Sequence, residues 1–277
     1  MKISGVVILY NPDIDLVKKN ISTYIDYLDK LFVIDNSNIS NAKYFINLNP
    51  KIEYTANLEN QGISKVLNNT CIKSIKEGYD LILTMDQDSF FDQSMIAIYM
   101  LYLEKIGLTE KAMLGITPKN YEDKYKLDFN KKPYEEETKL LITSGSIINL
   151  KLFNIIGGFN EKLFIDCVDF DYCLKSIING YKIVTIKNIY LYHIGGTPRK
   201  FLGKRIALYS PERYYYIFRN HIYMWLKYII HFPGLIIKNI FVNIILSILP
   251  NIFLGKNKLK FLSSLVKAIH DVPKVIK

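Results

Sequence analysis

Apolar residues along the first two thirds of the chain follow two repeating patterns. Short runs rich in apolar, β-branched or aromatic residues predict strands at 3–9, 31–34, 52–54, 81–85, 112–116 and 182–186. Elsewhere apolar residues recur every three to four positions, which predicts helices at 14–28, 63–76 and 94–105. This order predicts an α/β fold with a mostly parallel central sheet flanked by helices.

Two later stretches complete the pattern. The charged, tyrosine-rich residues 119–137 have no clear period, which predicts a mobile loop. Residues 140–148 return to strand character around Gly145, and a further helix is expected to end near Ile178.

Polar residues stand at the ends of the first four predicted strands. Asn11, Asp35, Asn60 and Asp88 each come shortly after one of these strands. Open α/β sheets bind ligands outside the carboxyl ends of their strands. We therefore expect these side chains to line one rim of the sheet.

The fourth strand runs directly into two carboxylates, Asp86 and Asp88, followed by Ser89. Residues i and i+2 of an extended or turning backbone can project to the same side, so the two aspartates can share one hard cation. Asp-x-Asp-Ser also favours a turn without any ligand. The motif alone therefore leaves a metal site and a simple turn as alternatives.

A second acidic cluster follows the Gly-Gly pair at 157–158. Capping and the helix dipole explain Asp171 at the start of a predicted helix. Asp169 lies beside other carboxylates and apolar residues, a setting in which a carboxylate can be tuned as a base. His193, which precedes another Gly-Gly pair, is either a metal ligand or a structural hydrogen-bonding residue.

Composition adds a division of charge to this picture. The 277 residues are 49% hydrophobic and 22% charged, which is typical of a globular protein and not of a disordered one. Residues 1–198 carry 22 Lys or Arg against 24 Asp or Glu, whereas residues 199–277 carry 14 against 2. The basic excess therefore lies wholly in the last 79 residues, which indicates a segment that faces an anionic surface.

The cysteines and the amino terminus indicate the compartment. The three cysteines form no C-x-x-C pair, and an odd count in a chain of this length fits a reducing environment. The apolar run at the amino terminus is too short for a signal peptide and is interpreted as the first strand.

Residues 235–249 are almost wholly apolar, but polar residues recur every four positions through this run and just beyond it, at Asn239, Asn243, Ser247 and Asn251. About 20 uninterrupted apolar residues are needed to span a membrane, and this run of 15 is bordered by prolines. A helix lying in the plane of a membrane, with the following lysines behind it, is therefore favoured over a span. A dimer-forming or core helix is the alternative. Nucleic acid is not an expected partner, because no recognition fold accompanies the basic residues.

The motifs, taken in order, resemble those of a known enzyme family. They are Tyr10-Asn11-Pro12, Asp35-Asn36-Ser37, Asn60-Gln61-Gly62-Ile63-Ser64, Asp86-Gln87-Asp88-Ser89, Gly157-Gly158-Phe159-Asn160-Glu161, Phe164-Ile165-Asp166, Val168-Asp169-Phe170-Asp171, His193 and Arg213-Tyr214-Tyr215-Tyr216-Ile217-Phe218-Arg219-Asn220. This set is similar to the family-two inverting glycosyltransferases with the GT-A fold, and most similar to their rhamnosyltransferase branch. The resemblance covers roughly residues 3–220 and implies a GT-A domain over 1–220. The basic charge and the polar spacing described above predict a basic, amphipathic helical, membrane-associating extension over 221–277.

The resemblance also implies which residues bind the nucleotide-sugar donor. The base and ribose would be held by Tyr10, Asn11 and Asp35. The nucleotide and its phosphates would be lined by Asn60, Gly62 and Ser64. Arg219 would reach a diphosphate, either of the donor or of a lipid-linked acceptor.

Metal and sugar contacts are implied in the same way. Asp88 would bind Mg²⁺ or Mn²⁺, His193 would complete the metal's ligands, and Asp86 would contact the metal or the ribose. Ser144 and Gly145 would lie near the donor sugar or acceptor, with packing of the strand as the alternative.

Asp169 falls where the family has its catalytic base. The common family pattern is Glu-Asp, whereas Val168 precedes Asp169 here, a change that the rhamnosyltransferase-like branch shares. Asp166 remains a competitor for the role. Inverting transfer needs a base to take the proton of the acceptor hydroxyl and a metal to neutralise the departing diphosphate, which this inventory could supply.

The sequence therefore predicts a peripheral enzyme at the cytoplasmic face of a bacterial membrane. It would transfer L-rhamnose from dTDP-L-rhamnose to a lipid-linked acceptor of a cell-surface polysaccharide. The alternatives are a UDP-galactose or UDP-galactofuranose transferase of the same fold and a membrane-peripheral protein that binds a nucleotide-sugar without catalysis. The extension could instead form a homodimer.

Overall fold

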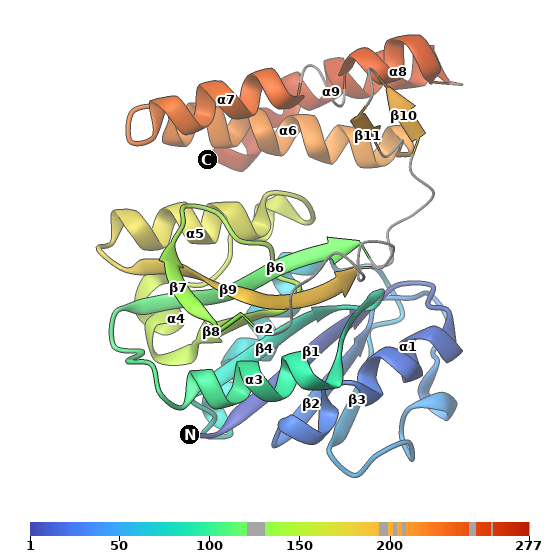
Figure 1. The fold of residues 1–277 in the computed structure, drawn as a ribbon. Helices are drawn as coiled ribbons and strands as arrows, with labels where there is room; N and C mark the ends of the chain where they lie inside the picture. Colours follow the sequence, from blue (N-terminus) through green and yellow to red (C-terminus); the bar gives the residue numbers. More distant parts are fainter. Residues whose placement is uncertain are drawn as a thin grey trace. The chain divides into compact units, whose positions relative to one another are not determined.

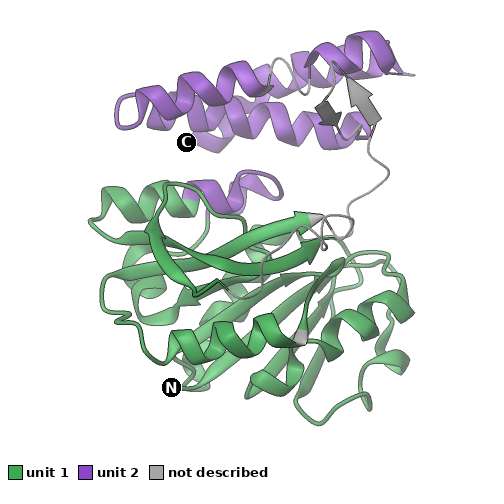
Figure 2. Cartoon of the chain, in the orientation of Figure 1, with its two compact units in different colours: residues 1–159, 172–194 green, residues 160–171, 195–277 purple. Residues whose placement is uncertain are grey.

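The computed structural model describes residues 1–120, 131–193, 199–201, 204–206, 209–243, 248–255 and 257–276. They form two compact units (Figure 2), of which unit 1 comprises 1–159 and 172–194 and unit 2 comprises 160–171 and 195–277. Helix α5 (Val168–Ile178) begins in unit 2 and ends in unit 1. The domain boundary predicted at residue 220 falls inside helix α6 (Pro211–Tyr228), and the units divide the chain at other positions.

Unit 1 contains a nine-stranded sheet with the order β3-β2-β1-β4-β8-β6-β9-β5, in which β7 also pairs with β9. The strands are β1 (Ile3–Leu9), β2 (Lys30–Asp35), β3 (Ile52–Ala56), β4 (Leu81–Asp86), β5 (Ser89–Phe91), β6 (Lys111–Asn120), β7 (Tyr134–Glu137), β8 (Ser146–Asn149) and β9 (Lys182–His193). The first four neighbours, β3, β2, β1 and β4, are parallel, as predicted. β8 is antiparallel to both β4 and β6, which makes the whole sheet mixed.

Helices cover both faces of this sheet (Figure 1). They are α1 (Ile14–Ser22), α2 (Ile63–Lys76), α3 (Gln93–Leu103) and α4 (Leu150–Ile156), with the short 3₁₀ helices η1 (Ile25–Tyr27) and η2 (Ala42–Tyr44). Buried residues of α1 and α3 join those of β1, β2 and β4 in one core cluster, which includes Val17, Tyr99 and Leu83. The predicted α/β fold is thus confirmed.

The structure changes two of the predicted segments. Part of the expected loop 119–137 is strand, because β6 extends to Asn120 and β7 pairs antiparallel with β9; residues 121–130 lie outside the described part. The expected strand 140–148 is wrong over its first half. Gly145 has a left-handed backbone (φ +74°) and Ser146 N donates to Thr143 O at 3.0 Å, so a turn precedes β8.

Unit 2 is mainly helical. Its elements are η4 (Glu161–Leu163), the start of α5, the hairpin β10 (Arg199–Phe201) and β11 (Lys204–Ile206), α6, α7 (Pro233–Asn243), α8 (Leu249–Leu254) and α9 (Lys258–Ile276). α6 and α9 share a buried cluster of Tyr214, Ile217, Phe218, Phe261 and Ala268. None of the described helices is long and apolar enough to cross a membrane.

The predicted helix 235–249 corresponds to α7 and the start of α8, and residues 244–247 lie outside the described part. Its regularly spaced polar residues contact α6. Asn239 Oδ1 accepts from Trp225 Nε1 at 3.2 Å, and Asn251 Nδ2 donates to the hydroxyl of Tyr214. Large apolar side chains such as Phe241 are exposed instead. Polar groups therefore hold these helices to α6 while apolar side chains face outward.

Candidate active site

Strand register brings the predicted rim residues to one edge of the sheet in unit 1. Asp35 ends β2 opposite Leu9 of β1, and Asp86 ends β4 opposite Ile8. Because these three strands are parallel, the loops that follow them leave from the same carboxyl edge. The expectation of one rim is confirmed for Asn11, Asp35 and the Asp86–Asp88 turn.

Asn36 organises the loops along this edge, although the sequence did not single it out. Its Nδ2 lies 3.4 Å from both Asn60 Oδ1 and Gly62 O, and its Oδ1 accepts from Asn57 Nδ2 at 2.7 Å. Asn60 Oδ1 also accepts from Gly62 N at 3.0 Å. Gly62 takes a φ of +80° just before α2, a conformation that favours glycine. Asn60 and Gly62 are therefore fixed at the entrance to α2, and Ser64 is buried in its first turn.

Asp35 is fully buried, and both of its carboxylate oxygens accept hydrogen bonds. Oδ1 accepts from Ser37 N at 2.9 Å, and Oδ2 accepts from Tyr54 Oη at 2.6 Å and from Asn41 Nδ2 at 2.9 Å. Burial alone would raise the pKa of Asp35, but these hydrogen bonds outweigh it and hold the pKa below its usual value. The carboxylate thus shapes the 36–41 loop, and its predicted contact with the nucleotide stays a prediction.

Gln87, the middle residue of the Asp86–Asp88 motif, ties this turn to the end of β1. Its Oε1 accepts from Tyr10 N at 2.9 Å, and its main-chain oxygen accepts from Asn20 Nδ2 at 2.9 Å. Asn11 N donates to Ser37 Oγ at 2.8 Å. The side chain of Tyr10 is half exposed, so its ring is accessible at the edge of the sheet.

Asp86, Asp88 and His193 form the one metal-capable cluster found in the described part of the chain. One ligand atom from each lies within 4.8 Å of the others, and all three side chains are partly buried. Pairing of β5 with β9 places Ser89 opposite His193, so residues far apart in sequence meet. His193 Nδ1 is 2.9 Å from Ser89 Oγ and 3.4 Å from Asp88 Oδ1. Two carboxylates and an imidazole suit Mg²⁺ or Mn²⁺.

The environment of Asp88 makes its charge unfavourable without a cation. Burial raises the pKa of Asp88, and the nearby His193 only partly offsets this effect. A divalent cation held by the three side chains would compensate the carboxylate charges. The residues therefore fit a metal, and a bound cation would offset the cost of burying the Asp88 charge.

Ser144 and Gly145 are packed beneath this cluster. Ser144 is buried and its Oγ accepts from Asp86 N at 3.3 Å. A side chain on Gly145 would come within 2.9 Å of Leu191. These contacts favour the structural alternative, in which both residues support the Asp86 turn, and the predicted sugar contact stays a prediction.

The remaining predicted residues, Asp166, Asp169 and Arg219, belong to unit 2. Asp166 forms an ion pair with Arg213, with Oδ1–Nη2 and Oδ2–Nε distances of 2.9 and 2.7 Å. Asp169 lies in the first turn of α5, is partly exposed, and its Oδ1 accepts from Phe170 N at 2.9 Å. Asp166 is thus paired with an arginine, and the predicted role of Asp169 as the base stays a prediction.

Arg219 is buried, and its donors are directed at protein oxygens. Its Nη2 lies 2.8 Å from Lys162 O and 3.1 Å from Leu163 O, and its Nε donates to Asn220 Oδ1 at 3.0 Å. These bonds give Arg219 a structural role in unit 2. Its predicted contact with a diphosphate stays a prediction.

Asp171 lies in the first turn of helix α5, as the sequence predicted, and its side chain binds residues of α6. Its Oδ1 accepts from Lys227 Nζ at 2.8 Å, from Tyr228 Oη at 2.9 Å and from Tyr223 Oη at 3.1 Å. A buried carboxylate needs such partners, and here α6 supplies them. Asp171 therefore ties the start of α5 to α6.

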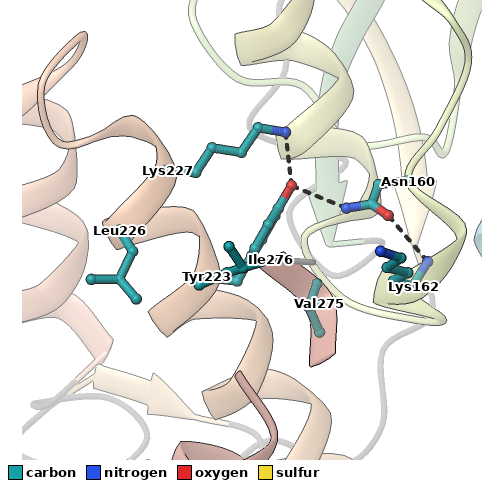
Figure 3. Close-up of a pocket in the computed structure, with 7 residues that line it drawn as sticks. All are labelled: Asn160, Lys162, Tyr223, Leu226, Lys227, Val275 and Ile276. Carbon is teal, nitrogen blue, oxygen red and sulfur yellow. Dashed lines mark hydrogen bonds between the residues drawn. The ribbon is translucent and has the colours of Figure 1, made fainter. Parts of the chain in front are cut away.

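A cavity of about 430 Å³ lies beside these contacts in unit 2 (Figure 3). It is lined by Asn160, Lys162, Tyr223, Leu226, Lys227, Val275 and Ile276. Figure 3 shows Tyr223 Oη between Lys227 Nζ and Asn160 Nδ2, at 2.7 and 3.0 Å. None of the residues predicted as site residues lines this cavity.

Comparison with known proteins places this geometry in context. The chain is 26% identical to dTDP-rhamnosyl transferase RfbF of Shigella flexneri, over 97% of this chain and 94% of that protein. It also resembles the crystal structure of S. aureus TarS 1–349 in complex with UDP-GlcNAc, with a TM-score of 0.61, 18% identity, and coverage of 100% of this chain and 82% of that one. No family model matches the chain.

GalNAc-T7, solved with UDP, GalNAc and Mn²⁺, shares the fold at a TM-score of 0.59 and 12% identity. The match covers 99% of this chain but only 57% of the GalNAc-T7 chain. The predicted GT-A fold is thereby confirmed, and the nearly full-length match to RfbF agrees with the resemblance of the motifs. The chain thus has the GT-A fold and is similar, over nearly its full length, to a dTDP-rhamnosyl transferase.

Proposed function

We propose that the chain is a metal-dependent inverting transferase that moves L-rhamnose from dTDP-L-rhamnose to a lipid-linked or growing polysaccharide acceptor. The observation that carries the proposal is the Asp86–Asp88–His193 cluster at the carboxyl edge of the sheet. The donor is proposed because the homologue RfbF is named a dTDP-rhamnosyl transferase. The solved neighbours contain UDP or UDP-GlcNAc, which supports a nucleotide-sugar as the donor class.

Different side chains would bind the donor, hold the cation and take the proton of the acceptor. Tyr10, with its exposed ring, and the loops fixed by Asn36 would receive the nucleotide. When bound, a divalent cation would offset the charge of the departing diphosphate. Asp169 would take the proton of the acceptor hydroxyl during attack on the anomeric carbon. Asp166 is less suited to this step because Arg213 pairs with its carboxylate.

A panel of donors tests this proposal. The purified protein would be incubated with dTDP-L-rhamnose, UDP-galactose, UDP-galactofuranose or UDP-GlcNAc, each with Mg²⁺, with Mn²⁺ or with EDTA, and release of the nucleoside diphosphate would be measured. We expect the nucleoside diphosphate to be released fastest from dTDP-L-rhamnose, and only when a metal ion is present. Faster turnover of a UDP-sugar would select the alternative donor, and binding without turnover of any donor or acceptor would indicate the non-catalytic alternative.

We also propose that unit 2 attaches the protein to the cytoplasmic surface of the cell membrane, where a lipid-linked acceptor would be available. Helix α9 supports this proposal because it has two apolar faces. One includes Phe261, Ala268 and Val272, which are buried. The other consists of exposed residues at helical spacing, Leu259, Leu262, Val266 and Ile269.

Lysines accompany the exposed apolar face of α9. Lys260, Lys267 and Lys274 follow one another at intervals of seven residues and so share one side of the helix. A helix with apolar residues beside a lysine row fits the boundary of an anionic bilayer, where the apolar side chains enter the interface and the lysines meet lipid phosphates. Helices α7 and α8 also carry exposed apolar side chains, including Phe241 and Phe253, which could enter the same interface.

A further inference from the structure

One face of helix α6 contacts the segment 163–167, which leads into helix α5; we call this segment the 163–167 loop. The contacting residues on α6 include Arg213, Tyr216 and Asn220, at positions i, i+3 and i+7. This spacing places them on one side of the helix. They belong to the tyrosine-rich stretch 213–220, to which the proposed chemistry gives no role.

The 163–167 loop has an unusual backbone. Phe164, Asp166 and Cys167 have φ values of +64°, +63° and +61°, and none of them is glycine. Residues with a Cβ rarely take this left-handed conformation, so the surrounding structure must impose it. Contacts with α6 add to the local main-chain bond from Ile165 N to Leu163 O in holding this backbone.

Asn220 supplies the central contacts. It is fully buried, and its Nδ2 lies 2.8, 2.6 and 2.9 Å from the main-chain oxygens of Leu163, Ile165 and Asp166. Its Oδ1 accepts from Arg219 Nε at 3.0 Å, which fixes the orientation of the amide. One side chain thus forms hydrogen bonds with three main-chain carbonyl groups of the 163–167 loop.

Neighbouring residues hold the rest of the loop. The ring of Phe164 stacks on Tyr216, with centroids 5.0 Å apart, and Arg213 pairs with Asp166. Arg219 Nη2 binds Leu163 O. The loop then enters α5 directly, because Asp171 N donates to Cys167 O at 2.9 Å, and Asp169 stands in that first turn.

We propose that Asn220 is a positioning residue that sets the location of the Asp169 carboxylate by fixing the 163–167 loop. This inference rests on the proposed role of Asp169 as the base. Asn220 itself would touch neither substrate nor metal. Releasing the loop would leave donor binding in unit 1 unchanged but misplace the base, and a displacement of about 1 Å can cost about 100-fold in rate.

The test is a double-mutant cycle on the transfer rate, with Asn220→Ala, Asp169→Asn and the double variant. Asn220→Ala should lower kcat about 100-fold, while KM for the donor and Mn²⁺-dependent binding of the nucleoside diphosphate stay within about twofold. If Asn220 acts through Asp169, adding Asn220→Ala to Asp169→Asn should cause little further loss. Multiplicative losses in the double variant would overturn the proposal.

Asn251→Ala is the matched control. Asn251 is also a buried asparagine of unit 2, and it bonds the hydroxyl of Tyr214 rather than the loop. This variant should lower the melting temperature without the selective fall in kcat. An equal fall in kcat for both variants would show that general destabilisation, not positioning, explains the effect. If Asn220→Ala unfolds the protein, Asn220→Ser, which keeps a smaller polar group, would be carried through the same cycle.

The single variants separate failure of this inference from failure of the proposed function. If Asp169→Asn keeps full transfer activity, the assignment of the base is wrong and the positioning role loses its basis. If Asp169→Asn abolishes transfer but Asn220→Ala keeps the wild-type kcat, the base assignment stands and the positioning role is refuted.

Discussion

The hydroxyl of Tyr54 on β3 donates a 2.6 Å hydrogen bond to Oδ2 of Asp35 on β2. It is one of several donors that stabilise the ionised form of a fully buried carboxylate at the edge where the donor is proposed to bind. The ring of Tyr54 also stacks on Phe45, with centroids 5.8 Å apart. The same hydroxyl accepts from Asn41 N at 2.9 Å, so removing it separates these hydrogen bonds from the packing of the ring.

Tyr54→Phe should destabilise the protein by about 1–3 kcal/mol at pH 7, the usual value of a hydrogen bond to a charged group. Because the pKa of Asp35 is lowered in the folded protein, its contribution to stability is present above the unfolded-state pKa of about 3.9 and is lost as the pH falls through the folded value. The difference between variant and wild type should therefore shrink below about pH 4.

Urea unfolding as a function of pH measures this effect. Tyr134→Phe, which changes an exposed tyrosine of β7, is the matched control and should leave stability unchanged. A difference for Tyr54→Phe that does not vary with pH would mean that the bond does not depend on the charge of Asp35.

The metal cluster gives a second prediction. Asp88→Asn should abolish the rise in melting temperature that Mn²⁺ causes and should remove metal-dependent transfer. Without metal, the same variant should be as stable as wild type or more stable at pH 7, because burial makes the ionised Asp88 unfavourable.

Thermal unfolding with and without Mn²⁺ between pH 5 and pH 8 provides the measurement. In wild type, the affinity for Mn²⁺ should increase with pH while Asp88 loses its proton, since a ligating carboxylate must be ionised. Asp15→Asn, at an exposed position in the first turn of α1, is the control. Unchanged stabilisation by Mn²⁺ in Asp88→Asn would exclude Asp88 as a ligand.

Local patterns predicted the framework of the site but not the partners within it. Runs of apolar residues gave the parallel strands, and their register then placed Asp35 and Asp86 at one edge. The meeting of Asp88 with His193 depends on pairing between β5 and β9, which lie about 100 residues apart and which no local period encodes. The hydrogen bonding of the Asp35 carboxylate likewise depends on Tyr54, which lies on a neighbouring strand.

Spacing alone also did not reveal the partners of buried charges. The sequence placed Asp171 at a helix start, as found, but its partners are Tyr223, Lys227 and Tyr228 of a helix that follows much later in the chain. Arg219 binds main-chain carbonyl oxygens, which a guanidinium can bind as well as phosphates, and its predicted contact with a diphosphate stays a prediction. Only tertiary contacts distinguish these uses of one residue type.

The two candidate bases give a third prediction. Asp169→Asn should lower kcat by about 10²–10⁴-fold with nearly unchanged affinity for the nucleoside diphosphate, because a general base contributes that much to rate. Asp166→Asn should keep a larger share of the activity, since its carboxylate is paired with Arg213. Asparagine tolerates the left-handed backbone at position 166, so this variant should fold.

Steady-state kinetics and nucleotide titration of both variants decide between the two carboxylates. A greater loss of kcat in Asp166→Asn than in Asp169→Asn would transfer the role of base to Asp166. Equal losses of kcat and of nucleotide affinity in Asp169→Asn would assign that residue to binding instead.

The exposed face of α9 gives the last prediction. The triple change Leu259→Gln, Val266→Gln and Ile269→Gln should reduce binding to anionic vesicles by more than 10-fold, because three large apolar side chains would no longer enter the interface. Replacing Lys260, Lys267 and Lys274 by Gln should weaken binding to anionic vesicles, and high salt should weaken the wild type in the same way. Vesicle flotation would measure membrane binding, and size-exclusion chromatography would measure the oligomeric state, of the wild type and of each variant. The three substitutions of apolar residues keep the buried face of α9, whereas deleting the extension would remove residues that form the core of unit 2. A wild type that is dimeric and ignores vesicles, together with a monomeric Gln variant, would show that this face binds a second copy of the chain rather than a membrane.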